Sequence, residues 1–516
     1  MSPARRVHIS PGAAHLTPEV LRLLDAWLPA QRWYPVPAQG VAHEPWLTVT
    51  FPGVADVVVA LLRLTGPGLA AGDESLVIQV PLVLAPTAEP VANTTESETT
   101  GLIGTVVTSS GTVAVHDGGV HPAAWHAYLT AALPGSCERD GGVGAEMAGA
   151  RRISGEQSNT SVVLPALPHG SGRGGMLKIL RTVVLGPHPD VVIPEVLARA
   201  GWDGVPRFLG AVGLPAAGVV AGACDPRDVP KSGDVHSRDD AEPLAYLAVL
   251  SELVADATDG FELACAYAAR DEDFGERAAE LGTVVAHLHA VLLRAMGPGP
   301  GLEPADFMGV LRRRAAEAFA DVPDLAPHRA GVTELYDAVR ARLSAAVERT
   351  GGLVPLQFIH GDLHLGQALH SPRGWKVLDF EGEPLRPVSE RTAPDLPLRD
   401  VAGMLRSLDY AAAVGQTTDP HWATHAQVSF LEGYREAQRR VQAEGYPQAS
   451  GETHEGTVPA VVGTAASAGE LDVATAELLL RALTVDKALY EVVYEFRHRP
   501  AWMHIPLAAV GRTLST

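Results

Sequence analysis

The stretch Leu356–Pro384 reads LQFIHGDLHLGQALHSPRGWKVLDFEGEP, and it decides the predicted fold. Its two apolar runs, LQFI and WKVLDF, predict two strands. Asp362 follows the first run within the tripeptide HGD, Asp379 ends the second run, and Gln367 lies on the intervening turn. Because a connection of this length returns the chain to the same end of a small sheet, we expect two carboxylates and one amide to lie together.

This set of side chains has the chemistry that phosphoryl transfer requires. Mg²⁺ prefers hard oxygen ligands and keeps several waters, so the carboxylate of Asp379 and the amide oxygen of Gln367 are sufficient to hold it with nucleotide phosphates. The carboxylate of Asp362 would stay off the metal, orient an acceptor hydroxyl and accept its proton. The pattern therefore predicts an ATP-dependent and Mg²⁺-dependent phosphotransferase that acts on an alcohol group.

Two other interpretations of these residues are simpler. Asp362 and Asp379, each taken alone, are ordinary turn and strand-end aspartates. His360 and His364 have the His-x-x-x-His spacing that binds a transition metal on a helix. Gly361 and the neighbouring strands argue against a helix at this point, so the phosphotransferase interpretation is favoured.

Composition limits the class of protein. The chain has 516 residues with 46% hydrophobic and 19% charged residues, which predicts two or three packed units. A formal charge of −20 argues against a nucleic-acid partner. The three cysteines are scattered, and no apolar run is long enough for a membrane span, so we expect a cytoplasmic protein with no membrane partner.

The pattern of apolar residues divides the chain into three predicted domains. Residues 1–135 combine strand-like runs with helices at Pro18–Leu28 and Ala123–Leu133. Residues 136–255 contain a Gly/Ser-rich turn between apolar strands, and residues 256–516 are mainly helical. The fold class predicted from this mixture is α+β.

The sequences HGDLHLGQ and LDFEGEP resemble the maltokinase-like branch of the aminoglycoside-phosphotransferase-like kinases. The resemblance implies a bilobal protein-kinase-like fold with an additional N-terminal α/β cap domain. Residues 1–135 would form the cap, 136–255 the N-lobe with the hinge, and 256–516 the C-lobe. It also implies that Asp362 is the catalytic base, that His360 orders the catalytic loop, and that Gln367 and Asp379 hold Mg²⁺.

The resemblance extends to an ATP site. The segment GEQSNTSVV is similar to a phosphate-covering loop, and SELVADATDGFE is similar to an adenine hinge. Lys178 lies inside the apolar run MLKIL, which favours the role of the phosphate-binding lysine over that of a surface lysine. By the same resemblance, the remaining ATP-site residues are Ser158, Asn159, Thr160, Glu252, Val254 and Glu195, the last as the ion-pair partner of Lys178.

A predicted helix over Asp486–Arg499 supplies candidates for the acceptor site. Lys487, Glu491, Glu495 and His498 fall at positions i, i+4, i+8 and i+11, so they share one face. One interpretation is a solvated stripe of salt bridges. The other is that this face binds a sugar, with the candidate residues Glu491, Glu495, Tyr494 and Trp502, and with Asp409 and Arg406 as further candidates.

Two sugars compete as the substrate. The segment QRWYPVPAQG keeps the QRWY of maltokinases but not the Gly/Lys-rich turn that follows it there. Paired glutamates and an acidic chain favour a cationic acceptor. We therefore expect phosphorylation of glucosamine to glucosamine 6-phosphate, with maltose to maltose 1-phosphate as the alternative and an aminoglycoside after it. Non-enzymatic alternatives are a pseudokinase scaffold, which predicts loss of Asp362, Gln367 or Asp379, and a carbohydrate-binding protein.

Overall fold

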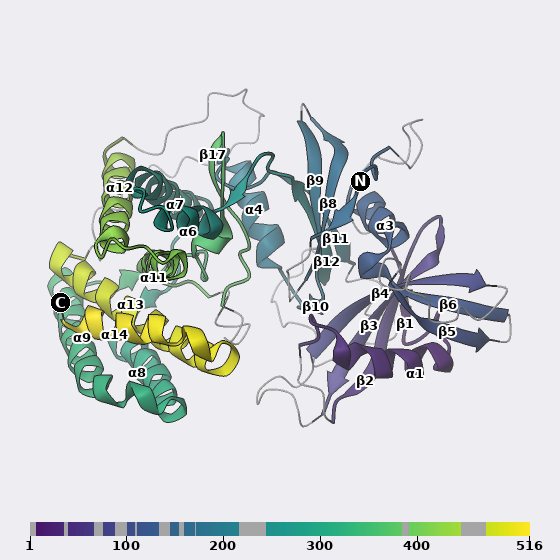
Figure 1. Ribbon diagram of the computed structural model, residues 1–516, viewed down its shortest axis with the longest axis horizontal. Coiled ribbons are helices and arrows are strands. Elements are labelled where there is room, and N and C mark those ends of the chain that lie inside the picture. Colours follow the sequence, from purple (N-terminus) through teal and green to yellow (C-terminus); the bar gives the residue numbers. More distant parts are fainter. Residues whose placement is uncertain are drawn as a thin grey trace. The chain divides into compact units, whose positions relative to one another are not determined.

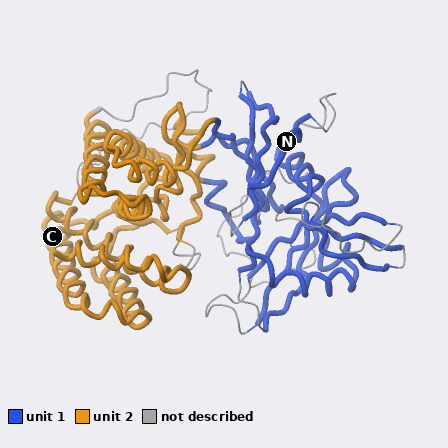
Figure 2. Tube along the Cα trace, viewed as in Figure 1, with its two compact units in different colours: residues 1–192, 206–255 blue, residues 193–205, 256–516 orange. Residues whose placement is uncertain are grey.

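The structure is a computed structural model, and it describes residues 7–35, 40–66, 76–87, 101–108, 111–133, 145–153, 159–170, 172–215, 244–383, 391, 393–444 and 471–515. The chain divides into two compact units (Figure 2), unit 1 with residues 1–192 and 206–255 and unit 2 with residues 193–205 and 256–516. Within the described ranges, every helix is too short or too polar to cross a membrane.

Unit 1 begins with an antiparallel sheet that has seven strands among the described residues, in the order β1-β2-β3-β4-β6-β5, with β10 paired to β4 (Figure 1). The strands are β1 (His8–Pro11), β2 (Ala42–Phe51), β3 (Val54–Thr65), β4 (Leu76–Thr87), β5 (Leu102–Thr108), β6 (Gly111–Asp117) and β10 (Thr182–Val183). The strand-like runs predicted within residues 1–135 thus form a single sheet.

Strand β3 explains why both faces of this sheet are covered. Successive side chains of a strand point to opposite faces. Val58 and Leu62 belong to the apolar cluster under helix α1 (Pro18–Trp27), whereas Val57 and Leu61 belong to a second cluster on the other face. An apolar residue at nearly every position of β3 therefore reflects burial on both sides.

The second cluster joins this sheet to the next one. A second sheet has the order β11-β12-β9-β8-β7. Its strands are β7 (Arg151–Arg152), β8 (Thr160–His169), β9 (Gly172–Ile179), β11 (Phe208–Leu214) and β12 (Ala245–Glu252). Helix α3 (Pro122–Ala132) packs between the two sheets, and its Trp125 and Tyr128 share one buried cluster with Leu177 and Leu247. The segments 1–135 and 136–255 therefore share a core inside unit 1, although the sequence pattern separated them.

Unit 2 is mainly helical, as the sequence pattern predicted for residues 256–516. Its longer helices are α6 (Gly260–Ala268), α7 (Gly275–Met296), α8 (Pro304–Asp321), α9 (Arg329–Thr350), α11 (Leu398–Gly415), α12 (Trp422–Glu444), α13 (Val473–His498) and α14 (His504–Ser515). Short strands complete it: β13 (Thr258–Asp259), β14 (Gly301–Leu302), β15 (Val354–Pro355), β16 (Ala368–Ser371) and β17 (Gly374–Val377). Helix α4 (Pro189–Arg199) begins in unit 1, and its Ile193 and Leu197 belong to the core of unit 2.

Helices α7 and α12 approach each other through glycine. A Cβ atom on Gly282 would lie 2.1 Å from the carbonyl oxygen of Phe430, and one on Gly433 would lie 2.1 Å from that of Ala279. Any side chain larger than hydrogen at these positions would force the two helix backbones apart. The close contact sets the spacing of the two helices.

The prediction of a strand at LQFI is wrong. The first run forms only an isolated bridge between Gln357 and Asp395, and β17 pairs instead with β16, from the sequence ALHS. The chain after Gln357 is held in an irregular loop by hydrogen bonds to α11, so its backbone groups need no strand partner. The two carboxylates nevertheless come from the two segments that the sequence indicated.

Candidate active site

The loop that carries Asp362 is held by one buried carboxylate, that of Asp400 on α11. Asp400 is 1% exposed, and its oxygens accept hydrogen bonds from the backbone N–H groups of His360 at 2.8 Å and Gly361 at 2.9 Å. The Nε2 atom of His289 contacts the same carboxylate at 2.9 Å. Burial alone would raise the pKa of Asp400, but the bond from His289 and the other donors lower it below its ordinary value.

His360 orders the turn and is not a metal ligand in this arrangement. Its Nε2 donates to the carbonyl of Leu378 at 2.7 Å, and its Nδ1 accepts from the backbone N–H of Asp362 at 3.3 Å. These two contacts use both ring nitrogens and require the neutral tautomer with hydrogen on Nε2. The transition-metal interpretation of His360 and His364 is therefore not supported, while the loop-ordering role is consistent with the contacts.

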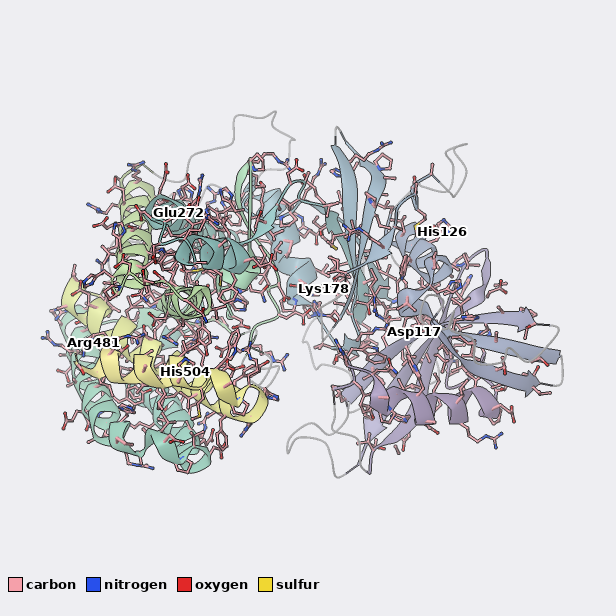
Figure 3. All side chains as sticks on the ribbon, viewed as in Figure 1. Asp117, His126, Lys178, Glu272, Arg481 and His504 are labelled. Atoms are coloured by element: carbon pink, nitrogen blue, oxygen red, sulfur yellow. The ribbon has the colours of Figure 1, made fainter. Side chains whose placement is uncertain are left out.

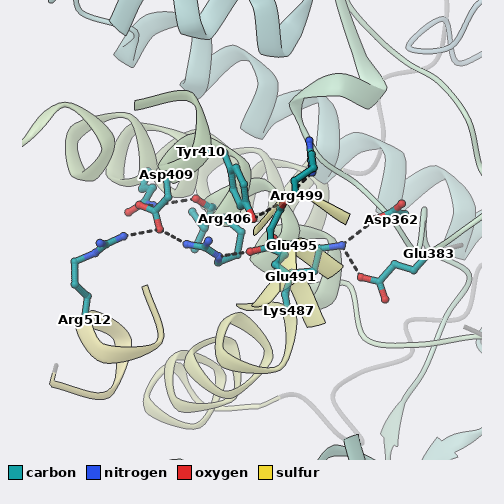
Figure 4. A network of polar contacts seen from close by, with 12 residues as sticks. Asp362, Glu383, Arg406, Asp409, Tyr410, Lys487, Glu491, Glu495, Arg499 and Arg512 are labelled. Carbon is teal, nitrogen blue, oxygen red and sulfur yellow. Dashed lines mark hydrogen bonds and ion pairs between the residues drawn. The ribbon is translucent and has the colours of Figure 1, made fainter. Parts of the chain in front are cut away.

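Asp362 itself forms an ion pair that the sequence did not predict. Lys487 Nζ on α13 lies 2.9 Å from Asp362 Oδ1 and 2.5 Å from Glu383 Oε1 (Figure 4). Burial alone would raise the pKa of Asp362, but the ammonium of Lys487 and, to a smaller extent, His364 hold that pKa below its ordinary value. Asp362 is therefore an ionised carboxylate.

Lys487 is the charged centre of this arrangement. Burial alone would lower the pKa of Lys487, but the carboxylates of Asp362, Glu383 and Glu491 raise it above its ordinary value. The signal for Lys487 was present in the sequence, since it shares a helical face with two candidate glutamates. What spacing could not show is that this face is turned inward, with only 12% of the Lys487 side chain exposed.

The residues predicted to hold Mg²⁺ lie together. Gln367 Nε2 donates to Asp379 Oδ2 at 3.1 Å, and a carboxylate oxygen of Glu381 lies within 4.8 Å of one of Asp379. Asp379 has a φ angle of 61°, which is uncommon outside glycine and marks a residue that its surroundings hold in place. Carboxylate and amide oxygens at this spacing fit a hard divalent cation, so the donor set suits Mg²⁺.

His364 connects the two parts of the site. Burial lowers the pKa of its ring, and the carboxylates of both Asp362 and Asp379 act against that shift, which places the two aspartates near one imidazole. A narrow cavity opens beside Asp362. It is lined by Gly361, Asp362, Leu363, Glu383, Arg399, Asp400, Gly403 and Lys487.

The lysine expected at the nucleotide phosphates has a different partner from the one that the resemblance implied. Lys178 Nζ on β9 donates to Asp190 Oδ2 at 2.6 Å, and both side chains are at most 15% exposed. Glu195 accepts instead from Arg199 at 2.5 Å on the exposed face of α4. Asp190 precedes Glu195 by five residues, so the acidic residue was sought one turn too late along the same helix.

Three more residues were predicted in the phosphate-covering segment. Ser158 lies outside the described residues. Asn159 and Thr160 are buried, and their side-chain oxygens accept hydrogen bonds from the backbone N–H and the Nε of Arg181, at 3.1 Å and 2.9 Å. Their side-chain oxygens are therefore engaged by Arg181 inside unit 1.

The predicted hinge residues lie at the end of β12. The N–H of Glu252 donates to the carbonyl of Arg207 at 2.8 Å, and the N–H of Leu253 donates to that of Gly174 at 3.1 Å. The side chain of Val254 is buried. These bonds fix the chain at the start of SELVADATDGFE.

The acceptor candidates form a polar network across α11, α13 and α14 (Figure 4). Arg406 is fully buried, donates to Glu491 Oε2 at 2.9 Å and also pairs with Asp409, which accepts from Arg512 at 3.0 Å. Glu495 accepts from both Tyr410 at 3.1 Å and Arg499 at 2.7 Å. The stripe on α13 is therefore a buried network and not the solvated stripe of the simpler interpretation.

Aromatic rings border the same network. The guanidinium of Arg499 lies 5.4 Å from the ring centre of Tyr494 and 4.7 Å from that of Trp502. Among the described residues, Arg406 NH2 and Glu495 Oε2 are buried without a hydrogen-bond partner. A donor and an acceptor left over in a buried polar network suit a ligand that carries hydroxyl groups.

The chain is similar to characterised sugar kinases. No family model matches it. A glucosamine kinase of Mycolicibacterium smegmatis (strain ATCC 700084 / mc(2)155) is 28% identical over 376 residues, which cover 71% of this chain and 80% of that protein. A glucosamine kinase of Streptacidiphilus jiangxiensis is 29% identical over 238 residues, which cover 44% of this chain and 47% of that protein.

Solved structures agree on the fold. A glucosamine kinase in complex with glucosamine, ADP and inorganic phosphate aligns with a TM-score of 0.55 and 23% identity, covering 89% of this chain and 92% of that chain. Crystal form B of glucosamine kinase aligns with a TM-score of 0.54 and 22% identity, covering 89% and 91%. The chain has their mixed helix and strand fold. Together with the curated relatives, this confirms the resemblance to protein-kinase-like sugar kinases that HGDLHLGQ and LDFEGEP indicated.

Proposed function

We propose that this protein is a glucosamine kinase, which transfers the γ-phosphoryl group of ATP to the 6-hydroxyl of glucosamine with Mg²⁺ as its cofactor. One observation carries the proposal. A chain that is similar over 71% of its length to a glucosamine kinase keeps an ionised Asp362 together with the Gln367–Asp379 pair. All three predicted residues are present, which argues against a pseudokinase scaffold.

The finer architecture belongs to the same proposal. Residues 1–135 form a cap that shares its core with an N-lobe of residues 136–255, and residues 256–516 form the C-lobe. The shared cluster of Trp125, Tyr128, Leu177 and Leu247 supports the joint between cap and N-lobe. The scattered cysteines support a cytoplasmic location, where thiols stay reduced.

The proposed reaction is a direct in-line transfer. The sugar hydroxyl oxygen forms a bond to the γ-phosphorus while the bond from that phosphorus to the β–γ bridging oxygen breaks, and ADP leaves. Asp362 orients the hydroxyl and receives its proton. The low pKa of Asp362 makes it a weak base, which suits a loose transition state in which the hydroxyl loses its proton late.

The remaining roles follow from charge. When bound, Mg²⁺ held by Asp379 and Gln367 neutralises charge on the phosphate oxygens. Lys178, oriented by Asp190, supplies a second cation for these phosphates. His360 keeps the loop in place through its bond to the Leu378 carbonyl, and Glu252 and Val254 bracket the adenine hinge.

The acceptor network supports an amino sugar. Glu491 and Glu495 already have arginine partners, so an ammonium group would enter a network of mixed charge and not a bare acidic patch. Burial raises the pKa of Glu491 against the opposing effect of Arg406. The buried Glu495 oxygen is the acceptor that we assign to the ammonium or a hydroxyl, with Tyr494 and Trp502 against the ring.

The test is the release of ADP from Mg-ATP with glucosamine, maltose, glucose and kanamycin supplied in parallel, followed by NMR of the product. We expect turnover with glucosamine and phosphorus coupling at carbon 6. Phosphorylation of maltose at its anomeric carbon would establish the alternative sugar. No ADP above the Asp362→Asn blank with any acceptor would refute the kinase assignment.

A further inference from the structure

We infer that Arg181 is a positioning residue through which the N-terminal sheet controls nucleotide binding. The inference deepens the proposed function and rests on it, since it concerns the ATP site of the proposed kinase. It concerns the part of the chain, residues 1–135, to which the proposed phosphotransferase chemistry gives no task. All residues that carry it lie in unit 1.

Among the described residues of unit 1, Arg181 is the largest side chain that is almost completely buried, with 1% exposure. It lies two residues after the end of β9 and three residues beyond Lys178. Its Nε donates to Thr160 Oγ1 at 2.9 Å, and its backbone N–H donates to Asn159 Oδ1 at 3.1 Å. Arg181 thus holds Asn159 and the first residue of β8, Thr160, which lie in the middle of the predicted phosphate-covering segment.

The other contacts of Arg181 come from the N-terminal sheet. Its NH2 lies 3.3 Å from Asp117 Oδ1 at the end of β6, and its guanidinium lies 4.4 Å from the ring centre of Trp33, in the sequence QRWY. Gly119 leaves the space for this group, because a Cβ there would lie 1.8 Å from Arg181 NH2. Arg181 therefore contacts residues of the second sheet and residues of the N-terminal part of unit 1.

A second set of bonds keeps the same junction rigid. Gln79 on β4 is fully buried, and its Nε2 donates to the carbonyls of Leu180 at 2.6 Å and Leu247 at 2.8 Å. The N–H of Gln79 donates to the carbonyl of Arg181 at 2.8 Å, and β10 continues from there as a strand of the N-terminal sheet. The chain after Lys178 is thus built into that sheet (Figures 1 and 3).

The consequence for ATP follows from the register of β8 and β9. Ser161 is opposite Lys178, and Thr160 is opposite Ile179, so Arg181 ties together the ends of the two strands that bracket the phosphates. A buried cation must keep its partners, because the loss of one leaves a charge unpaired away from water. Removing a residue of the N-terminal part that contacts Arg181 should therefore shift the positions of Thr160 and Lys178, although neither of them is mutated.

The experiment measures nucleotide and sugar separately. Asp117→Asn and Trp33→Leu alter the N-terminal side of Arg181, and Thr160→Val alters the lobe side with little change in volume. For all three we expect the Kd of Mg-ADP, by calorimetry, and the KM for ATP to rise about tenfold, a typical coupling between sites. The KM for glucosamine should stay within about twofold of the native value, since coupling is confined to the bonded network.

Two control variants separate positioning from general stability. Asp25→Asn makes the same chemical change as Asp117→Asn but removes an ion pair with His43 that does not involve Arg181. Leu343→Ala opens the core of unit 2, to which none of the named partners of Arg181 belongs, and lowers the melting temperature. Both should leave the Kd of Mg-ADP within about twofold of native, as expected for sites outside a coupled network.

Two results would overturn the inference. One is a folded Asp117→Asn or Trp33→Leu variant with native affinity for Mg-ADP, and the other is an equal loss of affinity in Leu343→Ala. Should Asp117→Asn not fold, the Trp33→Leu variant carries the test alone, because it removes no hydrogen bond from Arg181. Failure of the proposed function is distinguishable, since the native protein itself would then show no glucosamine-dependent release of ADP.

Discussion

The ammonium of Lys487 lies 2.9 Å from the carboxylate of Asp362, so a cation from α13 holds the proposed base in its charged form. The carboxylate of Glu383 lies 2.5 Å from the same ammonium, so Lys487 is paired with two carboxylates. The charge state of Asp362 therefore depends on a residue 125 positions away in the sequence.

Replacing Lys487 should lower turnover at acid pH, because Asp362 would then become protonated within that range. The lowered pKa of Asp362 keeps the native base ionised at any pH above about 4, the ordinary value of an aspartate. In Lys487→Met, burial is opposed only by the smaller effects of His364 and His360, so the pKa of Asp362 rises and the acid limb of kcat moves upward into the range of about pH 5–7. The check is a pH–rate profile, with Lys487→Arg as the control that keeps the cation. Superimposable profiles for the native protein and Lys487→Met would contradict the assignment.

Asp362→Asn should separate chemistry from binding. The amide keeps the shape of the side chain but cannot accept the hydroxyl proton, so kcat should fall by about 10²–10⁴-fold. Calorimetry should show a Kd for Mg-ADP close to native, because Asp362 is assigned to the acceptor. A variant with near-native turnover would remove Asp362 from the mechanism.

Changes at Asp379 should act on the nucleotide instead. Asp379→Asn keeps the positive φ of 61°, which asparagine tolerates, but loses the charge that binds the metal. We expect Mg-ADP affinity to fall at least about tenfold, as expected for a lost charged ligand. Chelation of the metal should weaken ADP binding to the native protein and have little effect on the variant. Equal sensitivity of both proteins to the chelator would argue against this metal site.

Replacing Asp400 should lower the free energy of unfolding, because its carboxylate holds the loop that carries Asp362. Its pKa is lowered in the folded state, so its contribution is present above the unfolded pKa of about 3.9 and is lost as pH falls toward the folded value. Asp400→Asn keeps the size but loses the charged acceptor of three donors, which should cost about 2–4 kcal/mol. Denaturant unfolding of both proteins at pH 7 and pH 3.5 checks this, and the difference between them should shrink at the lower pH.

Glu495 should decide the preference for an amino sugar. In Glu495→Gln the buried acceptor loses its charge but keeps its size and its contact with Tyr410. The ratio of kcat/KM for glucosamine over glucose should fall about tenfold, the value of one charge-assisted hydrogen bond. The matched change Glu477→Gln on the exposed face of α13 should leave the ratio unaltered. An unchanged ratio in Glu495→Gln would move the ammonium elsewhere in the network.

Local motifs predicted the centre of this site, whereas long-range pairings did not follow from them. Asp362, Gln367 and Asp379 stand within eighteen residues of one another in a motif with its own spacing, so the chemistry could be inferred from it. Asp400 and Lys487 lie far along the chain, and only the packing of α11 and α13 brings them to the loop. The residue types and the helical spacing in α13 did not indicate whether the face with Lys487 is buried or exposed to solvent.

The errors have local causes. LQFI has the composition of a strand, but Asp400 captures the next backbone N–H groups and stops the pairing. Glu195 was assigned by resemblance as the helix partner of Lys178, whereas the acid that contacts Lys178 is Asp190, in the first turn of α4. In both cases a hydrogen bond between residues far apart in the sequence decided the outcome, and local sequence preferences do not contain that information.

The glycine crossing of α7 and α12 reaches further than packing. Two turns along α7 from Gly282 lies His289, which contacts Asp400, and next to Gly433 on α12 lies Tyr434, which contacts His289 at 2.9 Å. One added methyl group at the crossing would draw this chain of polar contacts away from the HGD turn. Alanine at either glycine should thus act as the loss of a catalytic residue would, although the reacting groups are all intact.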